Sequence, residues 1–185
     1  MTGLFIVLGI LAVVAFIIIG IYNRLVALRQ TCNQAWADVD VQLKQRYDLI
    51  PNLVNTVKGY ASHEKETFEA VVAARNAAVA ANGVGDQAKA EGMLGAALGK
   101  LFALAEAYPD LKANTNFLQL QDQLADVENK IAASRRFYNN AAQEYNTARE
   151  QFPAVIIATP LGFVAREFFE APEGDALLTA PEVSF

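Results

Sequence analysis

The sequence predicts an all-α fold in which an N-terminal transmembrane helix continues into an elongated antiparallel helical bundle. An uncharged apolar stretch occupies residues 4–22. Two later stretches, residues 25–61 and 117–151, place apolar residues at three- and four-residue steps, the period of an α-helix. No segment shows the strict alternation of a half-buried strand. We therefore divide the chain into an anchor (1–22), a helical bundle domain (23–151) and a tail (152–185) that is first apolar and then acidic.

The anchor reads "LFIVLGILAVVAFIIIGIY" and carries no charged residue. About 20 apolar residues suffice to cross a bilayer as a helix. A cleaved signal peptide would need a basic start, a shorter apolar core and a small-residue cleavage site. The chain begins Met-Thr-Gly, "IGIY" (19–22) is a poor cleavage sequence, and the residues before Cys32 do not form a lipobox. We expect the segment to remain as an anchor.

The charges beside the anchor predict its orientation. No basic residue precedes the apolar stretch, whereas Arg24 and Arg29 follow it closely. The positive-inside rule then places the N-terminus outside and the helical domain in the cytoplasm. The single cysteine, Cys32, cannot form an intramolecular disulfide, so nothing indicates an oxidising compartment.

The first long helix contains a proline in "QRYDLIPNLVNTVKGY", residues 45–60. Pro51 has no backbone N–H and normally breaks or bends a helix. The apolar period nevertheless holds on both sides of it, and Asp48 is close enough to cap a restarted helix. We expect a kink in one long helix rather than a break, and we expect Pro51 to set the shape of the domain.

Further elements follow the same logic. Residues 87–107 are rich in glycine and alanine, which favours a tightly packed central helix. The last long helix covers about 117–151. The apolar stretch "FPAVIIATPLGFVAREFF" (152–169) is interrupted by two prolines and a glycine, which predicts extended or short helical pieces. Neighbouring helices, another subunit or lipid remain alternative covers for its apolar side chains.

Three stretches resemble the LemA family of proteins. They are "YNRLVALRQTCNQAWADVDVQLKQRYDLIPNLVNTVKGYASHE" (22–64), "AEAYPDLKANTNF" (105–117) and "LQDQLADVENKIAASRRFYN" (120–139). The resemblance implies a LemA-like fold. It also implies that the chain is a bacterial single-pass membrane protein with a soluble helical domain and no established catalytic activity. One relative belongs to the magnetosome membrane system, which implies a role in membrane organisation. The resemblance supplies no active site.

The residues themselves also argue against an enzyme. His63-Glu64 lacks the second histidine of a zinc protease motif, and the chain has no other histidine. Cys32 lies on an apolar stripe and is expected to be a buried small hydrophobe. No pair of Glu-x-x-His motifs is present for a di-iron site. We expect no catalytic residue, cofactor or metal, and the net charge of -5 argues against nucleic acid.

The candidate interaction residues are polar and aromatic. Tyr138-Asn139 and Tyr145-Asn146 repeat at a seven-residue step, so they share one helix face. They form either a solvated face with tyrosines in the core, or a hydrogen-bond network between helices or subunits that fixes register. The polar residues Asp38, Asp40, Gln42, Arg46 and Lys58 pose the same alternative. We expect structural or interaction roles for Trp36, Asp48, Pro51, Asn52, Tyr60, His63, Tyr138, Asn139, Tyr145 and Asn146, with His63 capping or bridging near Tyr60.

These observations predict a non-enzymatic, membrane-anchored helical scaffold that self-associates at the bacterial inner membrane. The expected partners are the lipid bilayer, further copies of the chain and a second membrane protein. The alternative is an adaptor or regulator of a membrane protease, transporter or sensor. A scaffold should form a defined assembly when purified alone, whereas an adaptor should be small alone.

Overall fold

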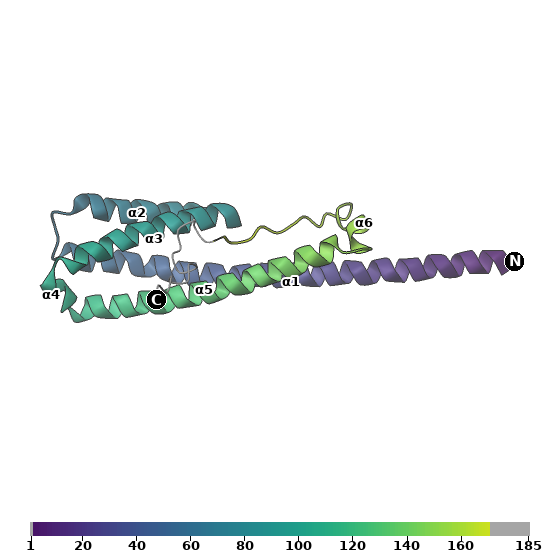
Figure 1. The fold of residues 1–185 in the computed structure, drawn as a ribbon, viewed down its shortest axis with the longest axis horizontal. Helices are drawn as coiled ribbons and strands as arrows, with labels where there is room; N and C mark the ends of the chain where they lie inside the picture. Colours follow the sequence, from purple (N-terminus) through teal and green to yellow (C-terminus); the bar gives the residue numbers. More distant parts are fainter. Residues whose placement is uncertain (1, 171–185) are drawn as a thin grey trace, which may run out of the picture. The chain divides into compact units, whose positions relative to one another are not determined.

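The computed structural model of the chain describes residues 2–170, and every regular element among them is a helix (Figure 1). The prediction of an all-α fold with a long apolar N-terminal helix is confirmed. The acidic part of the predicted tail, from residue 171, lies outside the described residues. The elements are α1 (Thr2–Lys58), α2 (Lys65–Ala80), α3 (Val84–Glu106), α4 (Pro109–Lys112), α5 (Thr115–Glu150) and α6 (Ala154–Ala158).

The described residues fall into two compact units, to which α1 and α5 both contribute. The first, here called the anchor unit, holds α1 up to Val39, α5 from Ser134, α6 and the chain up to Phe168. The second, the bundle unit, holds α1 from Asp40, α2, α3, α4 and α5 up to Ala133.

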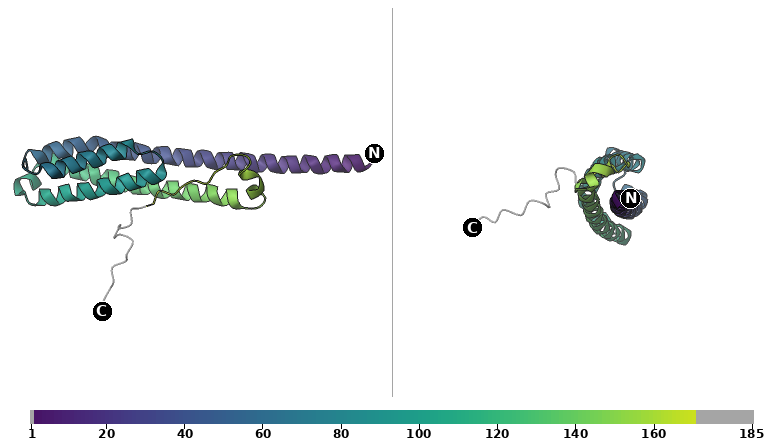
Figure 2. Two further views of the ribbon diagram at one scale, coloured as in Figure 1. Left: turned by 90° about the horizontal axis from the view of Figure 1, so that it is seen from above. Right: turned by 90° about the vertical axis from the view of Figure 1, so that its right-hand side faces the viewer.

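The bundle unit has a core drawn from each of its helices. A short turn after Lys58 returns the chain so that α2 and then α3 pack beside the last part of α1 (Figure 2). The spacing of apolar residues that predicted the helices is the spacing of the buried ones. Fully or almost fully buried side chains include Leu43, Ile50, Leu53, Val57, Val71, Leu94, Leu101, Leu111, Leu124 and Ile131.

Helices α1 and α5 are antiparallel in each unit. In the bundle unit Arg46 binds Glu128, whereas Tyr60, further along the chain, binds Asn114, which lies just before α5. In the anchor unit Trp36 contacts Tyr138 of α5, whereas Arg24, earlier in α1, shares a surface hollow with Thr147 and Ala148, later in α5. As the residue number rises along α1, the number of the facing residue in α5 falls.

Pro51 lies inside α1, which continues to Lys58, so the helix does not break there. Because proline lacks an N–H, the carbonyl of Tyr47, one turn earlier, loses its usual helical donor. Arg75 of α2 supplies a donor instead, since its Nε lies 2.8 Å from that carbonyl oxygen. Asp48 caps nothing here, because it lies in the helix interior and faces Lys44 at 3.6 Å. The kink stays a prediction.

The pairing of Pro51 with Arg75 predicts a non-additive pair of substitutions. Arg75→Met should lower the free energy of unfolding by about 1–3 kcal/mol, because the Tyr47 carbonyl is left without a donor. In a Pro51→Ala background the same change should cost clearly less, since the substituted alanine supplies the missing N–H. Urea unfolding of the full-length protein in detergent, followed by circular dichroism, gives all four stabilities. Equal losses in both backgrounds would contradict the pairing.

The anchor unit contains a helix whose surroundings change along its length. From Leu4 to Ile19 every side chain of α1 is exposed, and this helix alone among the described residues is long and apolar enough to cross a membrane. From Leu25 onward one face of the same helix is buried, at Leu25, Cys32, Ala35 and Val39. One uninterrupted helix therefore provides both the apolar span and part of a protein core.

Two glycines of α3 do not pack against a neighbouring helix as the sequence predicted. A Cβ placed on Gly95 or Gly99 would meet nothing within 4 Å, so these glycines face open space rather than a neighbouring helix. Leu94, Leu98 and Leu101 make up the buried side of α3. The exposed side carries what is here called the small-residue stripe: Gly95, Ala96, Gly99 and Ala103.

Candidate functional site

The bundle unit contains a buried charged cluster, here called the Arg46 cluster, formed by Arg46, Tyr47, Gln87, Glu91 and Glu128. Arg46 is 4% exposed and Glu91 is 8% exposed. The Arg46 guanidinium forms an ion pair with Glu91 through Nη2, and its Nη1 donates to Glu128 Oε1 at 2.6 Å. Glu128 lies at the rim, with 47% of its side chain exposed.

Tyr47 and Gln87 complete the cluster. The Tyr47 hydroxyl donates to Glu91 Oε1. Gln87 Nε2 lies 2.8 Å from both the Tyr47 hydroxyl and Glu91 Oε1, and 3.1 Å from the carbonyl of Ala78. Burial raises the pKa of the Tyr47 hydroxyl, and the charge of Arg46 opposes this in part. Tyr47 therefore stays protonated and can donate throughout the physiological pH range.

The Arg46 cluster joins three helices by polar contacts that tolerate little displacement. Arg46 comes from α1, Glu91 from α3 and Glu128 from α5. A buried charge needs its partners, so any other packing of these helices would strand the guanidinium or the carboxylate. The arrangement suits the specification of one helix packing.

The anchor unit contains a second polar cluster, in which α5 holds an extended segment by its backbone. This segment, residues 163–168, is here called the strap. The Tyr145 hydroxyl donates to the carbonyl of Val164, and the Tyr138 hydroxyl donates to the carbonyl of Glu167, each at 2.9 Å. Seven residues of α-helix rise about 10.5 Å, and three extended residues cover about 10 Å. The seven-residue tyrosine repeat therefore matches the strap.

Asn146 pairs with both backbone groups of Arg166. Its Oδ1 accepts from the Arg166 N–H at 2.8 Å, and its Nδ2 donates to the Arg166 carbonyl at 2.9 Å. The Arg166 side chain then reaches α1, where Nη2 donates to Asn33 Oδ1 at 2.6 Å. Trp36 of α1 packs edge-to-face on Tyr138, with ring centroids 5.2 Å apart. The strap is thus bound to both long helices.

Burial sets the protonation of this cluster. It raises the pKa of the Tyr138 and Tyr145 hydroxyls, against the opposing charge of Arg166, so both remain donors. Burial also raises the pKa of the Cys32 thiol. A raised pKa leaves less thiolate, which is the nucleophilic form, so Cys32 fits the expected buried hydrophobe.

The structure places the other predicted residues at the surface or in local contacts. Asp48 and Asn52 are exposed on α1, and the Asn52 carbonyl accepts from Thr56 within that helix. The Tyr60 hydroxyl accepts from Asn114 at 2.9 Å. His63 is exposed in the turn between α1 and α2, and Asn139 is half-buried on α5. Of the polar residues noted along the first helix, Arg46 is buried, Gln42 is half-buried, and Asp38, Asp40 and Lys58 are exposed.

Sequence reasoning missed several members of these clusters. Glu91 and Gln87 lie on the α3 stripe that also carries Leu94 and Leu98, and a carboxylate on an apolar stripe signals a buried ion pair. Arg75 carried no signal, because its role depends on a carbonyl in another helix. Arg166 carried none either, because Asn146 contacts its backbone.

A shallow hollow of about 280 Å³ lies between α1 and α5 in the anchor unit. All its lining residues but Ala148 are of polar types: Arg24, Asn140, Gln143, Glu144, Thr147, Ala148 and Gln151. Across residues 2–170, no group of three or more His, Cys, Asp or Glu side chains is placed to hold a metal ion.

Comparison with known proteins identifies the family of the chain. The LemA family model matches residues 35–185. The chain belongs to the LemA family. The magnetosome protein MamQ of Magnetospirillum gryphiswaldense is 27% identical over 97% of this chain and 77% of its own length. MamQ 2 of Paramagnetospirillum magneticum is 28% identical (96% and 76%), and the protein LemA of Metamycoplasma hominis is 25% identical (85% and 73%).

Proposed function

We propose that this LemA-family chain is a non-enzymatic, membrane-anchored helical scaffold that self-associates at the bacterial inner membrane, with its helical domain in the cytoplasm. The observation that carries the proposal is that α1 is both the exposed apolar span and a core helix of the protein. No loop separates the two roles, since α1 is continuous from Thr2 to Lys58.

The buried polar clusters support a structural role. The Arg46 cluster ties three helices of the bundle unit through a buried ion pair. In the anchor unit, Asn146 and the two tyrosines bind backbone atoms of the strap. Both clusters place their polar groups against one another, which favours the specification of one packed state.

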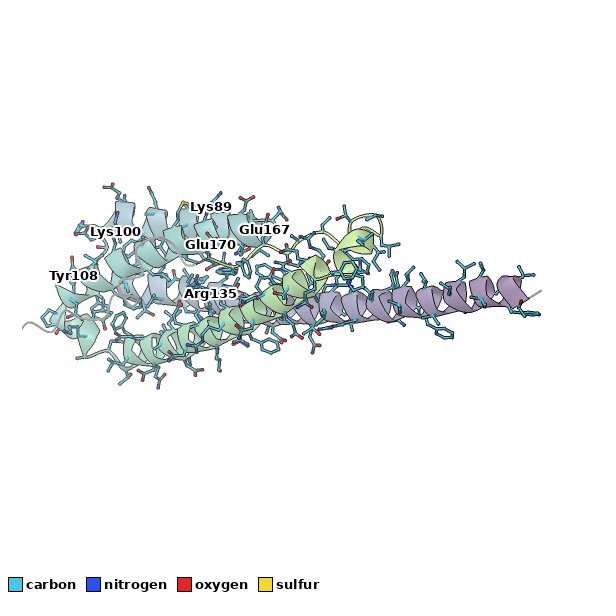
Figure 3. All side chains as sticks on the ribbon, turned by 45° about the vertical axis from the view of Figure 1, so that its right-hand side comes forward. Lys89, Lys100, Tyr108, Arg135, Glu167 and Glu170 are labelled. Atoms are coloured by element: carbon cyan, nitrogen blue, oxygen red, sulfur yellow. The ribbon has the colours of Figure 1, made fainter. Side chains whose placement is uncertain are left out.

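The small-residue stripe supports self-association. Gly95 and Gly99 have open space before them, and Lys89 and Lys100, labelled in Figure 3, are exposed on the same helix. Helices approach more closely where the contacting side chains are small. The likeness of nearly the whole chain to proteins named for the magnetosome further supports a role in a membrane assembly.

The test of self-association is the mass of the full-length protein in detergent, measured by light scattering with the detergent contribution subtracted. We expect a discrete multiple of 20.1 kDa. The double variant Gly95→Glu/Gly99→Glu should reduce this mass, because two carboxylates block close approach. It should keep the fold, because the added atoms enter open space and each glycine replaced removes a helix penalty of roughly 1 kcal/mol or less.

A control with the same charge change separates the stripe from a general effect. Ala125→Glu/Ala132→Glu alters two exposed positions of α5 in the same unit. This variant should keep the wild-type mass. Equal masses for both double variants would contradict a contact through the stripe. A wild-type monomer would overturn the scaffold and favour the adaptor of a membrane protease, transporter or sensor.

A further inference from the structure

The chain after α5 forms an exposed apolar loop, residues 152–164, here called the α6 loop, which shares its last two residues with the strap. Its sequence, "FPAVIIATPLGFV", contains no charged residue. Its small side chains face the protein, since Ala154 and Ala158 are buried. Five of its large apolar side chains face outward, with Ile156 63% exposed: Phe152, Val155, Ile156, Leu161 and Val164. Phe163 is buried and Ile157 is half-buried.

This distribution is the reverse of what water favours. A short surface helix normally turns its large apolar side chains toward the core. Here Phe163, at the start of the strap, is buried, whereas Val155 and Ile156 of α6 are exposed. Contiguous exposed apolar side chains of this kind indicate an interaction surface.

The position of the α6 loop identifies what covers it. Phe163 packs edge-to-face on Tyr22, with ring centroids 5.5 Å apart, and Tyr22 is the last residue of the uncharged span. Figures 1 and 2 both show α6 beside α1, with the N-terminal part of α1 extending past it. The loop therefore lies level with the end of the span, where a spanning helix leaves the hydrocarbon.

Arginines lie at the same boundary. Arg29 places its guanidinium carbon 5.1 Å from the centre of the Phe163 ring. Arg24 is exposed two residues after Tyr22. Apolar side chains followed by basic ones are typical of elements that lie in the interface of an anionic membrane.

We propose that the α6 loop inserts into the bilayer beside the span, as a second membrane contact of the same chain, with Arg24 and Arg29 reaching toward the lipid phosphates. The proposal rests on the membrane anchoring in the proposed function. The chain's own anchor sets the level of Tyr22, and therefore of the loop, whether or not other copies are present. Lipid is thus the occupant that the geometry favours over a second copy.

Depth-dependent quenching in vesicles of phosphatidylethanolamine and phosphatidylglycerol tests the proposal. Full-length protein with Cys32→Ala receives one cysteine, labelled with an environment-sensitive fluorophore. Ile156→Cys and Leu161→Cys report on the loop. Phe137→Cys is the matched control, because Phe137 is an apolar residue of the same unit, 55% exposed on α5. Ile10→Cys reports on the span.

Spin-labelled lipids with the nitroxide close to the headgroup should quench both loop probes about threefold more strongly than the Phe137 probe, because interfacial elements lie within several ångströms of the headgroups. Lipids with a deep nitroxide should quench the Ile10 probe most. Aqueous iodide should quench the Phe137 probe and spare the loop probes.

The outcomes separate this inference from the proposed function. A quenched Ile10 probe with loop probes that respond only to iodide overturns the inference and leaves the anchor intact. Loop probes spared by both lipid and iodide overturn it too, in favour of a second copy covering the loop. An unquenched Ile10 probe overturns the anchor itself.

Discussion

Replacing Glu91 with alanine should lower the free energy of unfolding by about 3 kcal/mol. The change leaves the guanidinium of Arg46 buried without its main partner, and breaking a buried ion pair in this way typically costs about 3–5 kcal/mol. We expect the lower end of that range, because Glu128 still accepts from Nη1 of Arg46. Urea unfolding of the full-length protein in detergent measures the loss.

Two further variants make the result specific to burial. Glu128→Ala should cost much less, because Glu128 is half exposed and ion pairs of exposed groups contribute little. Removing both buried charges, in Arg46→Met/Glu91→Leu, should recover part of the stability lost in Glu91→Ala. Equal losses in Glu91→Ala and Glu128→Ala would show that the buried pair does not dominate the cluster.

Replacing Asn146 with alanine should increase trypsin cleavage after Arg166 about 30-fold. Asn146 makes two hydrogen bonds to the backbone of Arg166, and two net contributions of about 1 kcal/mol each correspond to that factor in the opening equilibrium. Cleavage requires the strap to leave α5, so its rate follows the open population when opening is fast. The product is followed by mass spectrometry over time.

Asn140→Ala is the matched control for the strap. Asn140 lies on the same helix, is exposed and lines the polar hollow. Its loss should leave cleavage after Arg166 unchanged. Circular dichroism should show the same helix content in both variants, because the lost contacts of Asn146 lie outside the helix backbone. Similar cleavage rates in the two variants would contradict the role of Asn146.

The sequence predicted the three longest helices, α1, α3 and α5, because burial on one face imposes a period that each of them displays on its own. The apolar span was equally legible, since every residue from Leu4 to Ile19 is exposed on α1. The irregular segment predicted after residue 151 also matched, since the chain there forms only the short helix α6 before residue 170.

The clusters were harder to predict, because their contacts join residues far apart in the chain. The Tyr-Asn repeat indicated a shared face on α5, but its hydrogen-bond partners are backbone atoms of the strap, which have no sequence signature. The contact that accompanies Pro51 was also hidden, because the donor to the Tyr47 carbonyl is Arg75, which lies in another helix, α2. The sequence of α3 shows that its glycines are small, but it does not show whether they face a neighbouring helix or open space.

The hydrogen bonds from α5 to the backbone of the strap restrict which sequence changes the protein can accept during evolution. Tyr138, Tyr145 and Asn146 bind main-chain atoms of Glu167, Val164 and Arg166. Changing the side chain of Val164 or Glu167 therefore leaves these backbone hydrogen bonds in place, whereas a residue inserted or deleted between positions 164 and 167 changes the spacing of the bound carbonyls. Selection at this place therefore acts on the length of the segment and on the three side chains of α5. Within the strap it acts on Phe163, which packs on Tyr22, and on Arg166, which binds Asn33.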